Sequence, residues 1–175
     1  MKAKQLSMVM VLLGLISFNS YGHIGSINFS DTSIVQVDDG FFPDLNHTLE
    51  DSIVGFAMQL LGTPYVPAGC GREGFDCSGF VNYVFNRFKV NVPRRSIDFE
   101  HIGREVSINE AQKGDILLFI NPSQTVIGHV GIVTEPKGME SEFIHAASGR
   151  DRKVKISTIS TKGYTWRLAK VIRVL

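Results

Sequence analysis

The sequence predicts an α+β domain in which N-terminal helices pack on an antiparallel β-sheet. Before Pro93, apolar residues recur at the spacing of amphipathic helices. After Pro93, short runs of branched and aromatic residues are separated by Gly, Pro and Asn, as in antiparallel strands. Helices followed by strands are the pattern of the α+β class. The composition, with 43% hydrophobic and 20% charged residues among 175, is that of one globular domain, which we expect over residues 48–175.

The N-terminal residues 1–22 have the pattern of a secretory signal peptide. Lys2 and Lys4 precede an apolar run over residues 8–16, and small residues lead to a predicted cleavage site after Gly22. The apolar run is shorter than the roughly 20 residues that a membrane-spanning helix needs. We therefore expect a periplasmic or secreted mature protein without stable membrane insertion, with an uncleaved anchor as the alternative.

The mature chain is nearly neutral. Removal of Lys2 and Lys4 leaves 16 basic and 17 acidic residues, and the sequence contains no basic block. This charge distribution argues against nucleic acid as a partner. Residues 23–47 are polar and weakly patterned, which predicts an N-terminal arm or linker.

The first predicted helix begins after Thr48. Thr48 has the form of an N-cap, with the acidic residue Asp51 at the third helical position. Gly62 and Pro64 are expected to end the helix. Its apolar face comprises Ile53, Phe56, Ala57, Leu60 and Leu61.

The second predicted helix begins after Asp76, a favourable N-cap residue. Cys77 would then lie in the first helical turn. The apolar face of this helix comprises Phe80, Val81, Val84, Phe85 and Phe88.

Five short runs predict the strands of the sheet, which we expect to pack against the helix that carries Cys77. They cover residues 116–120, 129–133, 143–145, 154–156 and 169–174.

Cys77 is a candidate nucleophile because of its predicted place at a helix start. Unpaired backbone N–H groups and the helix dipole favour a thiolate there, and Gly74 and Gly79 leave space around the side chain. A small buried hydrophobic residue is the alternative interpretation of any single cysteine.

Two histidines and one tyrosine are candidates to assist Cys77. His129 opens one predicted strand and His145 closes another, so the two would be neighbours if these strands pair. A catalytic base needs a partner that fixes its tautomer, and a second histidine can serve. Tyr65 could donate to an oxyanion if the loop over residues 62–74 folds back over the helix start.

Six segments, in this order and at this spacing, resemble the successive motifs of NlpC/P60 peptidases over roughly residues 50–175. They are Gly62-Thr63-Pro64-Tyr65, Gly74-Phe75-Asp76-Cys77-Ser78-Gly79-Phe80-Val81, Pro93-Arg94-Arg95-Ser96, Lys113-Gly114-Asp115-Ile116-Leu117-Leu118-Phe119, Gly128-His129-Val130-Gly131-Ile132-Val133 and Phe143-Ile144-His145-Ala146.

The resemblance implies a papain-like α+β fold and hydrolysis of bacterial peptidoglycan stem peptides. The bond most often cut in the family joins γ-linked D-glutamate to diaminopimelate. By position, Cys77 matches the nucleophile, His129 the base and His145 the third polar residue. Neither a cofactor nor a metal ion is expected.

Further site residues follow from the same resemblance. Tyr65 matches a tyrosine near the oxyanion site. Asp76 and Ser78 flank the nucleophile where the free amine of a stem peptide is often held, and Arg94 is assigned to substrate binding.

The chain departs from the family pattern at two places. Tyr65 is followed by residues 66–71 with Cys70 among them, where many members have a Gly-Gly pair, and Phe99 stands where a glutamine often occurs. Stem-peptide preference therefore stays open, as does the oligomeric state.

Three alternatives compete with the peptidase interpretation. Cys70, Cys77, His129 and His145 supply four zinc-ligand types, although their spacing lacks the close pairs of structural zinc sites. A papain-like amidase or acyltransferase would act on another substrate. A non-catalytic module would bind wall peptides, with a disulfide between Cys70 and Cys77; a reversible form of that bridge would instead mask the nucleophile.

Overall fold

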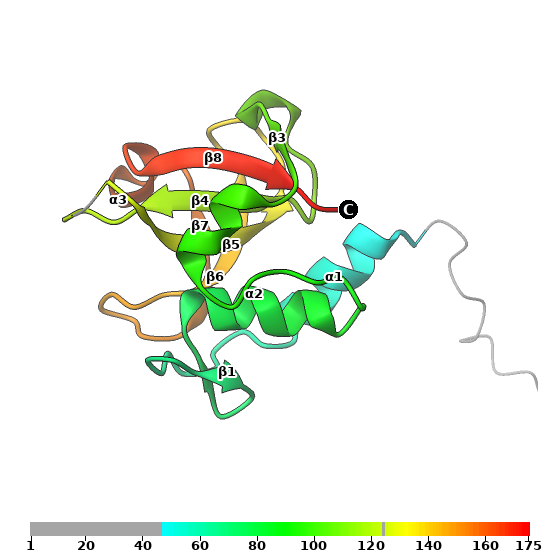
Figure 1. The fold of residues 1–175 in the computed structure, drawn as a ribbon, viewed down its shortest axis with the longest axis vertical. Helices are drawn as coiled ribbons and strands as arrows, with labels where there is room; N and C mark the ends of the chain where they lie inside the picture. Colours follow the sequence, from blue (N-terminus) through cyan, green and yellow to red (C-terminus); the bar gives the residue numbers. More distant parts are fainter. Residues whose placement is uncertain (1–46, 124) are drawn as a thin grey trace, which may run out of the picture. The chain divides into compact units, whose positions relative to one another are not determined.

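The structure is a computed structural model that describes residues 47–123 and 125–175 (Figure 1). The predicted signal peptide over residues 1–22 and nearly all of the predicted arm over residues 23–47 lie outside the described residues. No helix in the described part of the chain has both the length and the apolar character needed to cross a membrane. The elements are α1 (Leu49–Met58), β1 (Cys70–Gly71), β2 (Gly74–Phe75), α2 (Cys77–Asn86), β3 (Arg104–Val106), β4 (Ile116–Ile120), β5 (Ile127–Glu135), β6 (Glu142–Ala146), β7 (Val154–Thr158), α3 (Lys162–Thr165) and β8 (Leu168–Arg173), with 3₁₀ turns η1 (Ser96–His101) and η2 (Ile108–Glu110).

The strands form an antiparallel sheet, which confirms the predicted α+β class. Six strands pair in the order β3-β8-β4-β5-β6-β7, and β1 and β2 form a separate small hairpin. The run predicted over residues 116–120 is β4, and the other four predicted runs each fall on a strand. The sequence pattern missed β1, β2, β3 and α3, because each has only two to four residues and so lacks a readable period.

The capping box predicted for α1 is present. The Thr48 Oγ1 accepts the backbone N–H of Asp51 at 3.1 Å, and the Asp51 carboxylate accepts the N–H of Thr48 at 3.4 Å. The helix ends at Met58, earlier than the predicted stop at Gly62, because the following residues form tighter turns. Gly62 has a φ of 84°, a conformation that glycine adopts without strain.

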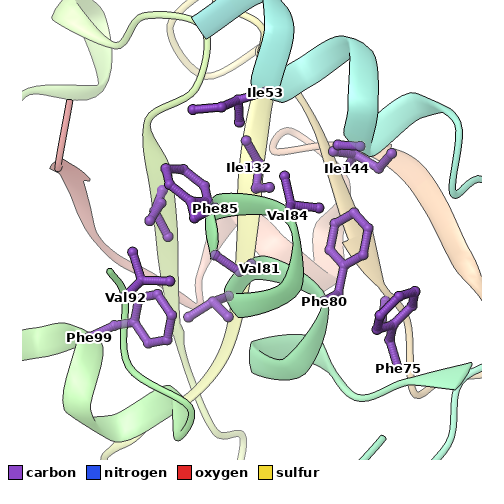
Figure 2. Packing of buried hydrophobic residues seen from close by; sticks show 14 of the residues in the cluster. Ile53, Phe75, Phe80, Val81, Val84, Phe85, Val92, Phe99, Ile132 and Ile144 are labelled. Carbon is purple, nitrogen blue, oxygen red and sulfur yellow. The ribbon is translucent and has the colours of Figure 1, made fainter. Parts of the chain in front are cut away.

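Helix α2 is held by the larger hydrophobic core. Phe80 and Val84 on α2 are fully buried and pack in the same cluster as Ile132 of β5 and Ile144 of β6 (Figure 2). Complete burial of one such side chain stabilises the fold by about 1.5–3 kcal/mol. The packing therefore fixes α2 against the middle of the sheet.

The opposite face of the sheet covers a second, smaller core. Alternation along the strands points successive side chains to opposite faces, so β4, β5 and β6 contribute to both cores. The second cluster comprises Val106, Ala111, Leu117, Phe119, Val133, Phe143, Ile159 and Val171.

A buried ion pair joins the start of β4 to the end of β8. Asp115 is 2% exposed, and its carboxylate accepts two hydrogen bonds of 2.8 Å from Arg173. The backbone N–H of Gln112 donates a further bond of 2.7 Å to the same carboxylate. Loss of the guanidinium would leave this charge buried without its cation.

We predict that Arg173→Met lowers the free energy of unfolding by about 3 kcal/mol, as measured by urea denaturation. Arg95→Met is the matched control, since Arg95 pairs with Asp98 at the surface and its side chain is 75% exposed. The control should keep the wild-type denaturation midpoint. Equal stability of Arg173→Met and wild type would contradict a stabilising role for the pair.

Candidate functional site

Cys77 is the first residue of α2, and Asp76 caps that helix. Asp76 has extended backbone angles, and its Oδ1 accepts the N–H of Gly79 at 2.7 Å. The predicted N-cap is confirmed. The cap places the Cys77 side chain at the end of the helix where backbone N–H groups are unpaired.

The loop before α2 folds back over the helix start, as expected. The N–H of Asp76 donates to the carbonyl of Gly69 at 2.9 Å. A Cβ on Gly79 would overlap that carbonyl oxygen, so this approach requires glycine. The same loop carries the half-buried ring of Tyr65, which packs against the main core as Cys77 does. Burial, followed by the charges of Cys77 and Asp76, raises the pKa of Tyr65.

Arg94 is hydrogen-bonded to Asp76 and Ser78, the other two residues assigned to substrate binding. Its guanidinium donates to both carboxylate oxygens of Asp76, at 2.9 and 2.8 Å, and to the Ser78 hydroxyl at 3.2 Å. It also donates to the carbonyl of Ala68 in the preceding loop at 2.8 Å. Arg94, Asp76 and Ser78 thus hold one another in place, and their contacts with a substrate stay a prediction.

The thiol of Cys77 lies against the backbone of β5. Its Sγ is 3.9 Å from the carbonyl oxygen of Gly128. Burial, followed by the Asp76 carboxylate, raises the pKa of this thiol, whereas the backbone N–H groups of Cys77, Ser78 and Val130 act in the opposite direction. The backbone N–H groups at the helix start thus favour the thiolate, as expected, but desolvation outweighs them and the net pKa shift is upward.

His129 lies next to a β-bulge in β5. Phe119 of β4 is paired with His129 but Ile120 is paired with Ile127, so Gly128 is the extra residue. A Cβ on Gly128 would press against the side chain of Asn121. The imidazole is 7% exposed, and its ring centroid is 5.9 Å from that of Phe119.

His129 and His145 form a hydrogen-bonded pair, as expected from adjacent strands. The Nε2 of His129 lies 2.9 Å from the Nδ1 of His145. The Nε2 of His145 in turn lies 3.0 Å from the Ser157 hydroxyl and 3.3 Å from the Tyr164 hydroxyl. If His129 is to accept a proton at Nδ1, its own hydrogen must be on Nε2, and the hydrogen of His145 is then also on Nε2, directed at these hydroxyls.

Ser157 and Tyr164 were not identified from the sequence. Ser157 follows the predicted run over residues 154–156 and is paired with Phe143 of β6, so alternation from His145 places it on the same face of the sheet. That signal becomes readable only when the pairing of the strands is known. Tyr164 comes from the short helix α3, whose local sequence carries no comparable signal.

Both histidines are neutral at pH 7. Burial, with the nearby charge of Arg167, lowers the pKa of His129 to about 3. Burial and the neighbouring His129 hold the pKa of His145 well below its usual value. Since the pKa of Cys77 is raised, the site at rest contains a neutral thiol and a neutral imidazole.

A cavity of about 400 Å³ opens beside His129. Its other walls include Gly128, Tyr164, Arg167 and residues 147–149. A ligand can therefore reach the buried imidazole through this cavity. The cavity is large enough for one amino-acid residue of a substrate.

The two cysteines do not form the disulfide considered in the binding-module alternative. Cys70 is exposed, Cys77 is partly buried, and both thiols are free. Among residues 47–123 and 125–175, no group of three or more His, Cys, Asp and Glu side chains is arranged to hold a metal ion.

Comparisons with known proteins all point to one family. The sequence profile described as the NlpC/P60 family matches residues 62–173. The probable endopeptidase NlpC of Escherichia coli is 36% identical over 115 residues, which cover 62% of this chain and 72% of the relative. A γ-D-glutamyl-L-lysine dipeptidyl-peptidase of Bacillus cereus is 29% identical over 133 residues, which cover 75% of this chain and 38% of the relative.

A solved structure agrees with this grouping. An NlpC/P60 family protein from Bacillus cereus superimposes with a TM-score of 0.67 at 29% identity, over 73% of this chain and 41% of that one. The matched part spans about half or less of the length of several curated relatives, between 26% and 52%.

We predict that acidification destabilises the fold through the two buried histidines. Unfolded histidine binds a proton below pH 6.5, whereas folded His129 does so only near pH 3, so the stabilisation is present above pH 6.5 and is lost as the pH falls. Between pH 7 and 5 the loss from His129 should be about 2 kcal/mol, by urea denaturation, and the lowered pKa of His145 adds a loss in the same direction. His101→Asn, at an exposed position, should keep this dependence; a flat stability would contradict burial of the pair in neutral form.

Proposed function

The chain belongs to the NlpC/P60 family, and on that premise we propose that it is an exported cysteine peptidase that hydrolyses peptidoglycan stem peptides. One observation carries the proposal. The thiol of Cys77 lies at a helix start against Gly128, and the next residue, His129, is hydrogen-bonded through its Nε2 to His145. A nucleophile, a base and an orienting residue are the parts that acyl transfer by a thiol needs.

The reaction begins from the neutral pair. The Nδ1 of His129 accepts the proton of the Cys77 thiol as Sγ attacks the scissile carbonyl carbon. Proton transfer during attack is the route suited to this site, since the raised pKa of Cys77 and the low pKa of His129 disfavour a resting ion pair. His145 holds His129 in the tautomer that leaves Nδ1 unprotonated.

The tetrahedral intermediate then collapses to an acyl-enzyme. Its oxyanion is stabilised by the backbone N–H of Cys77 and by the hydroxyl of Tyr65. His129 gives its proton to the leaving amine and a thioester forms on Cys77. His129 next takes a proton from water, which attacks the thioester, and the returned proton restores the thiol as the acid product leaves.

The bond we propose joins γ-linked D-glutamate to the third residue of the stem peptide, most often diaminopimelate in this family. The name of the Bacillus cereus relative, γ-D-glutamyl-L-lysine dipeptidyl-peptidase, supports a γ-D-glutamyl bond. Asp76, Ser78 and Arg94 are not among the described residues that line the cavity beside His129, and they would hold the amine end of the peptide.

Export is proposed from the N-terminal pattern of the sequence. Two lysines, a short apolar run and small residues precede Gly22, and the proposed substrate lies outside the cytoplasmic membrane. Cleavage after Gly22 in the periplasm or on secretion would release the mature chain, which N-terminal sequencing of protein from a bacterial host would test.

We predict that Cys77→Ala abolishes release of stem-peptide fragments from purified peptidoglycan under reducing conditions, as measured by mass spectrometry. Wild type should give fragments that end in γ-D-glutamate. Cys70→Ala is the matched control, since Cys70 is a free thiol at the surface, and it should cleave as wild type does. Cleavage by Cys77→Ala would refute the assigned nucleophile. No cleavage by folded, reduced wild type would favour another substrate or a binding module.

We also predict that Ser157→Ala lowers kcat by about three- to tenfold and leaves KM nearly unchanged, because the hydroxyl fixes the tautomer of His145 rather than touching the substrate. Ser157→Thr keeps a hydroxyl and should restore most of the rate. Ser160→Ala removes an exposed serine bonded to Glu140 and should have no effect. A rise in KM alone, or failure of the threonine to restore kcat, would contradict a positioning role.

A further inference from the structure

The cavity beside His129 has a single charged side chain in its wall. That side chain is Arg167, and its neighbours there include Gly128, Ser148 and Tyr164. None of the described residues that line the cavity is an Asp or Glu. A ligand group in this space therefore meets a positive charge with no competing carboxylate.

Arg167 is held in position without being neutralised. Its Nε donates to the carbonyl of Ile120 at 2.7 Å. Across residues 47–123 and 125–175, it forms no ion pair with an acidic side chain. Burial lowers its pKa, in contrast with Arg94 and Arg173, whose pKa values are raised by partner carboxylates.

The geometry of a guanidinium determines which group would suit it. Among the described residues, the Arg167 side chain donates only from Nε, to Ile120, which leaves its two terminal nitrogens able to donate to a ligand. A planar carboxylate is the acceptor that matches two parallel N–H donors. Hydrogen bonds to a carboxylate would also replace the hydrogen bonds to water that the half-buried Arg167 has lost.

The position of the cavity indicates which part of a substrate enters it. His129 lies in the cavity wall, whereas Tyr65 and Asp76 do not line it. The group that protonates a leaving amine must lie within hydrogen-bond reach of that amine. Since His129 forms part of its wall, the cavity is placed to receive the residue that is released.

We propose that Arg167 forms a subsite for a carboxylate carried by the residue whose amine is released. The inference rests on the proposed function and names the chemistry of that residue. Two sources supply such a group: the α-carboxylate of a stem peptide that ends at this residue, or the side-chain carboxylate of a diamino-dicarboxylic acid. A lysine with an amidated C-terminus has neither.

Three peptides with the same L-Ala-γ-D-Glu portion separate these sources. The third residue is L-lysine amide in one, L-lysine with a free α-carboxylate in the next, and diaminopimelate with its α-carboxylate amidated in the last. For wild type we expect kcat/KM about 10- to 100-fold higher for at least one of the carboxylate peptides than for lysine amide. Whichever peptide shows the preference identifies the source.

Arg167→Gln should abolish this preference while it still cleaves lysine amide. Because the ratio is taken within one variant, a general loss of folded protein does not alter it. Arg152→Gln is the matched control, since its guanidinium lies 5.3 Å above the ring of Tyr65 and it does not line the cavity, and it should keep the wild-type ratio.

Binding measured by calorimetry to Cys77→Ala, with and without Arg167→Gln, tests the subsite independently of turnover. Absence of cleavage by wild type overturns the proposed function, but tighter binding of a carboxylate peptide that requires Arg167 still supports the subsite. Equal binding of all three peptides, or an unchanged ratio in Arg167→Gln, overturns the subsite.

Discussion

The site depends on the packing of one helix against the sheet. Phe80 and Val84 hold α2 over Ile132 and Ile144, and the start of the helix therefore meets β5 where the strand bulges at Gly128. This contact joins two segments about 50 residues apart in the sequence. It determines that Cys77 lies beside the backbone that leads into His129, so the catalytic geometry is a consequence of core packing.

Burial has a second effect, on charge. Desolvation raises the pKa of Cys77 and lowers that of both histidines, so the same packing that brings the groups together keeps them neutral. The helix start acts in the opposite direction but is the smaller influence at Cys77. Charged side chains lie near these neutral groups: Asp76 is paired with Arg94 at the start of α2, and Arg167 lies in the cavity wall beside His129.

Much of the fold could be predicted from the sequence because its signals are local. Thr48 and Asp76 are N-caps whose side chains bond within their own helical turn, and the run over residues 116–120 is apolar from end to end. The adjacency of His129 and His145 also followed, once two strands were assumed to pair. Ser157 could not be identified, because its role depends on the register between β6 and β7, which local patterns do not determine.

The direction of the pKa shift at Cys77 could not be predicted from the sequence, for a related reason. A helix start is visible in sequence through Asp76, but the degree of burial comes from how the preceding loop folds back and from β5, which is distant in the sequence. The surroundings of Arg167 are hidden in the same way, since its local sequence gives no sign that the carbonyl of Ile120 fixes it or that no carboxylate of the described residues neutralises it.

The unequal exposure of the two cysteines affects how the protein responds to alkylating reagents. Cys70 is exposed, whereas Cys77 is partly buried with a raised pKa, and a thiolate is the form that such reagents attack. Small electrophiles such as iodoacetamide would therefore modify Cys70 first. Extensive alkylation of the protein can therefore leave Cys77 unmodified. A covalent inhibitor selective for Cys77 would need to bind in the cavity beside His129, because the reactivity of the thiol alone would not direct it there.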